Sequence, residues 1–181
     1  MTVNTKKLVL DLDETLVFST IESAGSHSIE LMAAGTPFFT TLRPGVKSFL
    51  EHVSKKYDCY IWSTGVQPYI ESLWNYIGVP GFTLWGRSYC RRIEGFDSLE
   101  PYEKPLNKIT EDFSRVVIVD NTPSMYSKYP LNGIPIRTWR GDREDTELEH
   151  LQIYLDWLSN QESVQRVHQS WRIETLCLRS K

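Results

Sequence analysis

Three short apolar runs, each ending abruptly in polar side chains, constrain the fold of this chain most strongly. The runs are residues 8–10 (LVL), 59–62 (CYIW) and 116–119 (VVIV). Continuously apolar, β-prone runs of this length are typical of strands that are buried on both faces of a parallel sheet. The polar ends that follow are residues 11–13, 63–64 and 120–121. The runs therefore predict three buried parallel strands.

Helical periodicity lies between and after these runs. Apolar residues repeat at helical spacing over 46–53, directly after Pro44-Gly45, and over 66–77, where Gly78 stops the pattern. A third helix is predicted over 145–158, with four leucines on one face. Because strands alternate with helices, the fold class is α/β, with a Rossmann-like parallel sheet flanked by helices and joined by right-handed crossovers.

Two segments do not fit simple strand–helix units. Residues 28–42 predict a small inserted β-hairpin around an Ala-Gly-Thr-Pro turn, and residues 79–103 predict an insertion of loops and short strands. Both are too short for a cap domain of about 50 residues or more. A chain of 181 residues predicts one domain, placed at 1–160. Residues 161–181 predict an amphipathic helix (Val164, Val167, Trp171) that packs on the sheet or contacts a partner.

Composition excludes several classes of protein. A net charge of −3, from 20 basic and 23 acidic residues, gives no basic excess for direct nucleic-acid binding. The 3 cysteines form no CxxC pair and share no zinc spacing with the 4 histidines, which favours a reducing compartment. No apolar run approaches the ~20 residues of a membrane span, and the N-terminal segment does not resemble a signal peptide. We expect an intracellular protein, nuclear or cytoplasmic.

The polar strand ends predict a site. Ligands of open α/β sheets bind beyond the carboxyl ends of the strands, so these ends should converge on one place. The residues brought together are Asp11, Asp13, Thr15, Ser63, Thr64, Asp120 and Asn121. Their carboxylates need a cation, and an all-oxygen donor set favours Mg²⁺. Carboxylates beside Mg²⁺ suggest phosphoryl transfer with a carboxylate nucleophile.

Each residue also has a plainer interpretation when taken alone. The DLDET segment is compatible with a turn or a helix N-cap, and Ser63 with the N-cap of the helix that follows. Asp120-Asn121 before Thr122-Pro123 is compatible with a turn, and Lys104 with a surface lysine. The combination of three polar strand ends favours a site.

The chain resembles a known superfamily in several motifs. LVLDLDETLVFS is similar to the DxDx(T/V) motif of the haloacid-dehalogenase-like (HAD-like) phosphotransferases. More narrowly, the chain resembles the small C-terminal-domain phosphatase and Dullard group. The matching pieces occur in the family's order over residues 7–158: LVLDLDETLV, LRPGVKSFLEHV, YIWSTG, the lysine of YEKPL, RVVIVDNTPSMY and DTELEHLQIYLDWL. The resemblance does not cover the tail after about residue 160.

The resemblance implies roles for the site residues. Asp11 is the expected nucleophile, which becomes an aspartyl-phosphate, and Asp13 the general acid and base. Mg²⁺ is expected on Asp11, the main-chain carbonyl of Asp13 and Asn121, with Asp120 beside them. Ser63, at a position where the family usually has Thr, and Lys104 are expected to stabilise the transferred phosphoryl group. The remaining candidates for binding phosphate or substrate are Thr15, Thr64, Arg87 and Tyr69.

The predicted function is thus a Mg²⁺-dependent protein serine/threonine phosphatase with a phosphoprotein substrate. Two alternatives remain open: a peptide-binding module of the same fold, and a small-metabolite phosphatase. Phe38, Phe39 and Trp85 are further candidates for the mouth of the pocket, whereas Cys59 and Cys90 are expected to be inert. The identity of the substrate and the oligomeric state are left open.

Overall fold

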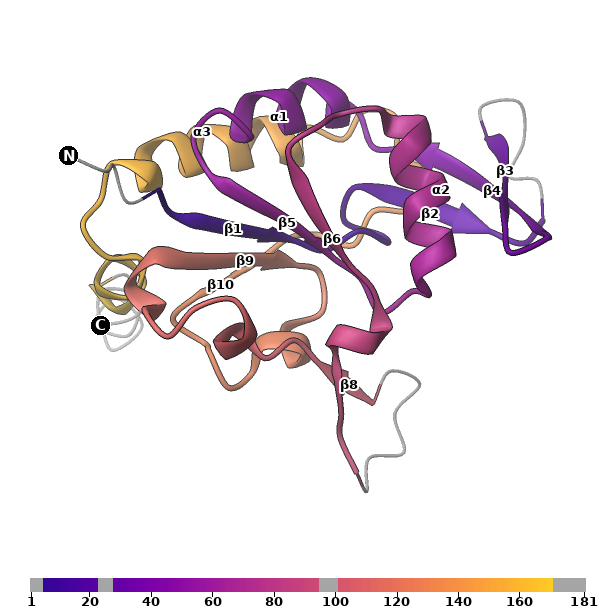
Figure 1. Ribbon diagram of the computed structural model, residues 1–181. Helices are drawn as coiled ribbons and strands as arrows, with labels where there is room; N and C mark the ends of the chain where they lie inside the picture. Colours follow the sequence, from indigo (N-terminus) through magenta and orange to yellow (C-terminus); the bar gives the residue numbers. More distant parts are fainter. Residues whose placement is uncertain (1–4, 23–27, 95–100, 171–181) are drawn as a thin grey trace, which may run out of the picture.

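A five-stranded parallel sheet forms the centre of the computed structural model, which describes residues 5–22, 28–94 and 101–170 (Figure 1). Its strands, in spatial order, are β10 (Gly133–Pro135), β9 (Val116–Asp120), β1 (Lys7–Leu10), β5 (Asp58–Trp62) and β6 (Phe82–Trp85). The three predicted strands are its central members. Leu10 of β1 lies opposite Val119 of β9 and Ile61 of β5, which sets the three polar ends side by side.

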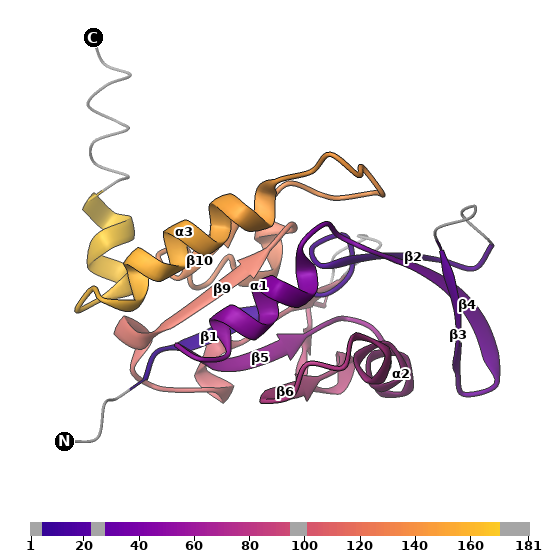
Figure 2. The same ribbon diagram turned by 90° about the horizontal axis from the view of Figure 1, so that it is seen from above.

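The two faces of the sheet are covered differently. Alternate strand residues such as Leu8, Ile61 and Val117 pack against three helices: α1 (Val46–Val53), α2 (Gln67–Ile77) and α3 (Glu147–Ser159). α1 and α3 lie side by side on this face (Figure 2). The opposite face, which includes Val9 and Ile118, packs against the short 3-10 helices η2 (Leu106–Lys108) and η4 (Pro123–Tyr126).

The predicted helices are confirmed, with small shifts at their ends. α1 follows Gly45, and α2 ends at Gly78, and both glycines have positive φ angles of 74° and 75° that suit a residue without a Cβ atom. α3 begins two residues later than predicted, at Glu147, after Thr146. Among the described residues, no helix is both long and apolar enough to cross a membrane.

The predicted hairpin is present, but its turn differs and a third strand joins it. β3 (Ile29–Ala33) and β4 (Thr36–Leu42) are joined by Ala34-Gly35, whose φ angles of 48° and 83° match the twist of a tight hairpin. The predicted turn was therefore wrong in including Thr36 and Pro37, which belong to β4. β2 (Val17–Thr20) pairs with the other edge of β4, so the insertion is a three-stranded antiparallel sheet.

The segment predicted as an irregular insertion contributes a strand to the main sheet. β6 pairs with β5, and its Phe82 and Trp85 rings pack on Trp74 and Trp62. The same segment adds the 3-10 helix η1 (Arg87–Tyr89) and a two-stranded sheet of β7 (Arg91–Arg92) and β8 (Tyr102–Glu103). The edge strand β10 was also not predicted, since it is short and ends in a proline.

Part of the predicted C-terminal helix packs on the molecule. Residues 164–170 are helical, and Val164 and Val167 join the cluster on the helix-covered face. The Nδ1 atom of His168 lies 2.9 Å from the carbonyl oxygen of Leu131, within hydrogen-bonding distance. Trp171 and the rest of the tail lie outside the described residues. A domain boundary at residue 160 stays a prediction.

Candidate active site

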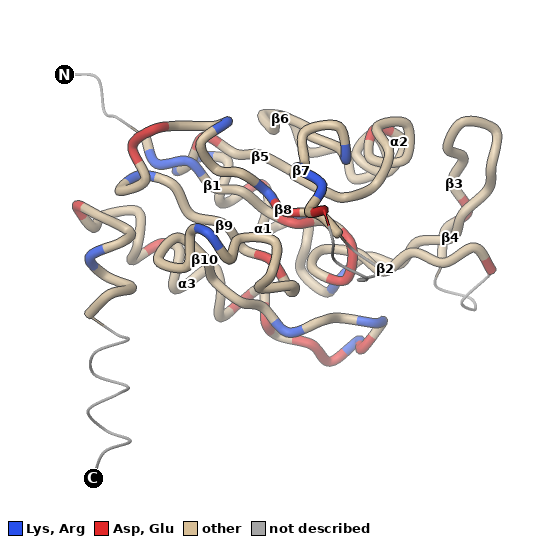
Figure 3. The backbone as a smooth tube through the Cα atoms, turned by 90° about the horizontal axis from the view of Figure 1, so that it is seen from below, with Lys and Arg blue, Asp and Glu red and all other residues tan. Residues whose placement is uncertain are grey.

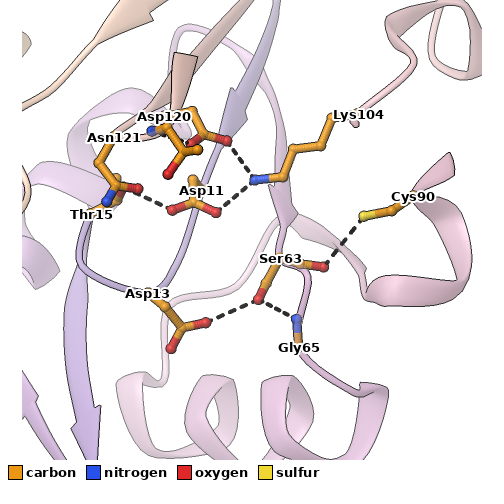
Figure 4. Close-up of polar contacts among 10 residues, drawn as sticks. Asp11, Asp13, Thr15, Ser63, Gly65, Cys90, Lys104, Asp120 and Asn121 are labelled. Atoms are coloured by element: carbon orange, nitrogen blue, oxygen red, sulfur yellow. Dashed lines mark hydrogen bonds and ion pairs between the residues drawn. The ribbon is translucent and has the colours of Figure 1, made fainter. Parts of the chain in front are cut away.

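The carboxyl ends of β1, β5 and β9 meet at one edge of the sheet and carry the predicted polar residues (Figure 4). Asp11 directly follows β1, Ser63 follows β5, and Asp120 ends β9. The backbone N–H of Asp11 donates to the carbonyl oxygen of Val119 at 2.9 Å, which extends the pairing of the two strands up to the site. A pocket at this edge is lined by Asp11, Asp13, Glu14, Thr64, Asp120, Asn121, Thr122 and Met125.

Lys104 joins the carboxylates of two strands. Its Nζ atom lies 2.6 Å from Asp11 Oδ1 and 2.7 Å from Asp120 Oδ2, and its side chain is fully buried. Burial by itself lowers the pKa of Lys104, but the charges of Asp11 and Asp120 outweigh it and raise that pKa above its ordinary value. Lys104 is therefore held as a cation between the two carboxylates and is not the surface lysine of the plainer interpretation; its role toward a phosphoryl group stays a prediction.

The carboxylates outnumber this cation. Burial first, and then the charge of Asp11, raise the pKa of Asp120 above its ordinary value even though Lys104 acts in the opposite direction. The backbone N–H of Thr122 donates to Asp120 Oδ1 at 2.8 Å. Asp11 and Asp120 contact Lys104 and Asp13 lines the same pocket, so the site carries an excess of negative charge when all three carboxyl groups are ionised.

Thr15 and Asn121 meet behind Asp11. The Thr15 hydroxyl is fully buried and donates to Asp11 Oδ2 at 2.9 Å. It also lies 3.4 Å from Asn121 Oδ1, while Asn121 Nδ2 donates to Thr138 Oγ1 at 3.2 Å. This places Thr15 as a support for the Asp11 carboxylate; a direct contact of Thr15 with substrate stays a prediction.

Asp13 lies on the other side of the site. Ser63 Oγ donates to Asp13 Oδ2 at 3.0 Å, and the Tyr69 hydroxyl donates to Asp13 Oδ1. Removal from water raises the pKa of Asp13 to about 6, with a smaller contribution from the charge of Asp11, although both hydrogen bonds act to lower it. Burial, followed by the charge of Asp13, raises the pKa of Tyr69, which keeps its hydroxyl a donor.

The loop after β5 holds Ser63, Thr64 and Arg87 together. Ser63 is almost fully buried, and its Oγ accepts a hydrogen bond from the backbone N–H of Gly65 at 2.9 Å. Thr64 lines the pocket. The exposed Arg87 donates from Nε to the carbonyl oxygen of Thr64 at 2.6 Å, and its guanidinium lies 5.7 Å from the centre of the Tyr102 ring. Arg87 therefore stands next to the pocket.

The aromatic and cysteine candidates lie apart from the pocket lining. Phe38 is buried with its ring 4.8 Å from that of Tyr69, and Trp85 stacks on Tyr89. Phe39 sits on β4 opposite Glu30 and Thr20. Burial raises the pKa values of Cys59 and Cys90, which keeps both thiols protonated.

Glu14 is one of three pocket residues that sequence reasoning missed. It has a left-handed backbone with φ 58°, and its carbonyl oxygen accepts a hydrogen bond from the N–H of Trp139 at 2.7 Å. Its position directly after Asp13 was the available signal. Thr122 and Met125, which also line the pocket, follow the predicted Asp120-Asn121 pair in the same way.

The donor set fits a hard cation. Among the described residues, no three His, Cys, Asp or Glu side chains converge as a ready-made metal cluster. The expected set is different, because it combines the Asp11 carboxylate with the amide oxygen of Asn121 and a main-chain carbonyl. Mg²⁺ prefers oxygen ligands and keeps several waters, so few protein donors are needed. The excess negative charge beside Lys104 supports such an ion.

The sheet, its two small antiparallel insertions and the carboxylates at its strand ends define a HAD-like protein. The chain belongs to the NLI interacting factor-like phosphatase family, whose model matches residues 6–165. The fold is also similar to solved structures of the RNA polymerase II CTD phosphatase Fcp1. A fission yeast variant bound to beryllium fluoride has a TM-score of 0.59 at 18% identity, covering 95% of this chain and 55% of that one. At that identity, the likeness supports the fold alone.

Curated relatives are phosphatases by name. The chain is 31% identical over 172 residues to a probable C-terminal domain small phosphatase of Dictyostelium discoideum, covering 91% of this chain and 54% of that protein. It is 34% identical over 168 residues to the CTD nuclear envelope phosphatase 1 homolog of Drosophila melanogaster, covering 86% of this chain and 68% of the relative. The chain thus spans about half to two thirds of the length of these relatives.

Proposed function

We propose that this chain is a Mg²⁺-dependent protein serine/threonine phosphatase that works through an aspartyl-phosphate on Asp11. One observation carries the proposal: the Asp11 carboxylate is held at the end of the central strand by Lys104 and Thr15, with Asp13 facing the same pocket. A nucleophile and an acid–base group two residues apart on one strand end can act on one bound phosphoryl group.

The first proposed step transfers the phosphoryl group to the enzyme. An Asp11 carboxylate oxygen bonds to phosphorus, and the bond between phosphorus and the seryl or threonyl oxygen breaks. Asp13, protonated at this stage, gives its proton to the leaving oxygen. The cation of Lys104 beside Asp11, together with the nearby Ser63 hydroxyl, stabilises the negative charge on the transferred group.

The second step returns Asp11 to its starting state. Asp13, now a carboxylate, takes a proton from a water molecule whose oxygen bonds to phosphorus. The bond between phosphorus and Asp11 then breaks, and inorganic phosphate leaves. Asp13 thus gains back the proton that it lost in the first step, and each half of the cycle uses the same side chain in opposite directions.

Mg²⁺ would be held by Asp11, Asn121 and the main-chain carbonyl of Asp13, with Asp120 beside it. When bound, it supplies electrostatic stabilisation of the phosphoryl oxygens. Thr15 donates to Asp11 and lies 3.4 Å from Asn121 Oδ1, so its side chain stands between two of the proposed ligands.

A phosphoprotein is the substrate that the surroundings of the site favour. Within the described residues, the insertions are a three-stranded and a two-stranded sheet, which leaves the pocket accessible to a segment of another protein. Figure 3 shows Lys and Arg dispersed among Asp and Glu, and within the described part of the chain no long basic stretch favours nucleic acid. The relatives named for the nuclear envelope support a nuclear or cytoplasmic location.

The proposal is tested by turnover of a phosphoserine and phosphothreonine peptide panel beside sugar and nucleotide phosphates. We expect kcat/KM to be far higher for phosphopeptides, to vanish with a chelator and to return with Mg²⁺ but not with zinc. Equal or better turnover of a small metabolite would favour the metabolite phosphatase instead. Peptide binding without turnover by protein loaded with Mg²⁺ would favour the binding module.

A further inference from the structure

We infer that Tyr69 is a positioning residue for Asp13, and that it fixes the Asp13 carboxyl so that Oδ2 is the oxygen that exchanges the proton with substrate and water. This inference rests on the proposed function. It departs from the sequence-based expectation that Tyr69 binds substrate.

The first argument is the division of hydrogen bonds at Asp13. Its two carboxylate oxygens have different partners: Tyr69 at Oδ1 and Ser63 at Oδ2, 3.0 Å away. Ser63 Oγ is also the hydroxyl expected to turn toward the transferred phosphoryl group. When it does, Oδ2 loses its donor on the side of the reaction, while Oδ1 keeps Tyr69.

The second argument is that the Tyr69 hydroxyl is itself held from behind. It lies 2.8 Å from Ser19 Oγ on β2, and Ser19 Oγ lies 2.9 Å from Thr40 Oγ1 on β4. Thr40 is fully buried. The three hydroxyls form a row that runs from the inserted antiparallel sheet to Asp13.

The third argument is the packing of the Tyr69 ring. Phe38 of β4 meets it edge-on at 4.8 Å between ring centres, and α2, which carries Tyr69, packs against β3. A Cβ atom on Gly65 would lie 2.9 Å from Tyr69 Cδ1 and 3.1 Å from Ser63 Oγ. Gly65 therefore permits both donors of Asp13 to sit close together, and the ring has little freedom to move away.

Through these contacts the inserted antiparallel sheet would hold Asp13 in position for the proposed reaction. Both proposed steps need the Asp13 oxygen at a fixed place relative to the phosphoryl group, and misplacement of an acid–base group slows proton transfer. The row of hydroxyls fixes that place from an element that does not itself contribute a reacting atom.

The test is Tyr69→Phe, which removes the hydroxyl and keeps the ring. We expect kcat to fall about 10-fold with KM unchanged, and trapped phosphoenzyme to decay more slowly by a similar factor, since both steps use Asp13. Ser19→Ala, one contact further away, should give a smaller fall in the same two rates. Tyr76→Phe is the matched control: it makes the same change on the same helix, where the ring lies 5.2 Å from Lys47 Nζ, and it should leave both rates unchanged.

A second measurement separates positioning from packing. The effect of Tyr69→Phe is measured again in an Asp13→Asn background. If Tyr69 acts only through Asp13, the substitution should now change the residual rate of phosphoenzyme decay less than about 2-fold, because the effects of two coupled residues do not add. An undiminished effect in that background would overturn the inference.

Two further outcomes also overturn it. Wild-type values of both rates in Tyr69→Phe would mean that the ring alone matters, and a raised KM with unchanged kcat would mean that Tyr69 contacts substrate. Wild-type protein that turns over no phosphopeptide would overturn the proposed function, and this role with it. Circular dichroism and thermal melting of each variant show whether it is folded before its rates are compared.

Discussion

Two buried cations, Arg43 and Lys104, illustrate how the same kind of interaction serves different purposes in this molecule. Arg43 pairs with a single carboxylate: Nε lies 2.7 Å from Asp145 Oδ1, and Nη2 lies 2.9 Å from Oδ2. Its remaining nitrogen donates to the carbonyl oxygen of Thr15 at 2.9 Å. Both side chains are almost completely excluded from solvent. The charges of this pair therefore balance, and solvent does not reach them.

Lys104 is also buried, but its surroundings are unbalanced. It serves Asp11 and Asp120 together, and both carboxylates face the pocket. A planar guanidinium suits a fixed two-point contact, whereas an ammonium group acts as a point charge shared among several oxygens. The comparison shows that burial of a charge does not by itself distinguish the two clusters, whereas unbalanced charge at a pocket does.

The largest expected effect comes from changing the unbalanced cluster. Asp11→Asn should lower kcat about 10⁴-fold, or roughly 5.5 kcal/mol of activation free energy, because the nucleophile is lost. The melting temperature should stay the same or rise, since one of the crowded carboxylates is removed. Steady-state kinetics and thermal melting measure the two effects. Asp58→Asn, an exposed carboxylate paired with Lys7, is the control and should retain activity. More than a few per cent of activity in Asp11→Asn would contradict the covalent mechanism.

The balanced pair should respond in stability. Arg43→Met leaves Asp145 buried and unpaired, and we expect a loss of about 3–5 kcal/mol in the free energy of unfolding. Urea denaturation measures this loss. The double variant Arg43→Met with Asp145→Leu should recover most of it, because no unpaired charge remains. A single variant as stable as the wild type would show that the buried Arg43–Asp145 pair does not stabilise the fold.

An effect of intermediate size is expected from Mg²⁺ binding, which should stabilise the Lys104 cluster and not the Arg43 pair. Saturating Mg²⁺ should raise the stability of the wild type by about 2–3 kcal/mol at a concentration near 100 times its Kd, because the ion binds only the folded site. Asp11→Asn should show a much smaller rise, while Arg43→Met should show the same rise as the wild type. Differential scanning fluorimetry with and without Mg²⁺, at the same ionic strength in all samples, gives the comparison. No shift in the wild type would argue against the metal assignment.

The smallest expected effect is a pH dependence of the balanced pair. Burial alone raises the pKa of Asp145, but the hydrogen bonds and charge of Arg43 outweigh it and hold that pKa below the ordinary 3.8. The stabilisation is therefore complete above the ordinary pKa and is lost as the pH falls through the lower value of the folded state. Urea denaturation from about pH 4 down to about 2 should show this loss, and the Asp145→Asn variant should show less of it. Equal slopes in both proteins would contradict this origin.

The sequence predicted those parts of the molecule that depend on local pattern. The central strands and the three helices follow from apolar runs and periodicity, and the positions of Asp11, Ser63 and Asp120 follow from the geometry of parallel strands. The edge strands β6 and β10 were missed because their stability depends on neighbours: aromatic packing on β5 in one case, and pairing with β9 in the other.

Side-chain contacts within the site were harder to predict than its location. The hydrogen bond from Thr15 to Asp11 was not predicted, because it arises where the turn after β1 folds the Thr15 hydroxyl back onto the strand end. The contact of Tyr69 with Asp13 joins a helix to a loop 56 residues earlier in the chain. Periodic patterns in a sequence predict neighbours within one helix or strand, so they could not predict this contact. The pairing of Arg43 with Asp145 spans 102 residues and had no local signal either.

The central position of β1 has a consequence for the order in which the site is completed during synthesis. Asp11 is made early, but Lys104 follows 93 residues later, and the strand that carries Asp120 must then pair alongside β1. Contacts between such distant residues form slowly and late in folding. In a growing chain the strand that carries Asp11 can thus pair with β5 first, and the candidate site is incomplete until β9 has emerged from the ribosome. On the proposed function, chain order would therefore keep partly made protein inactive.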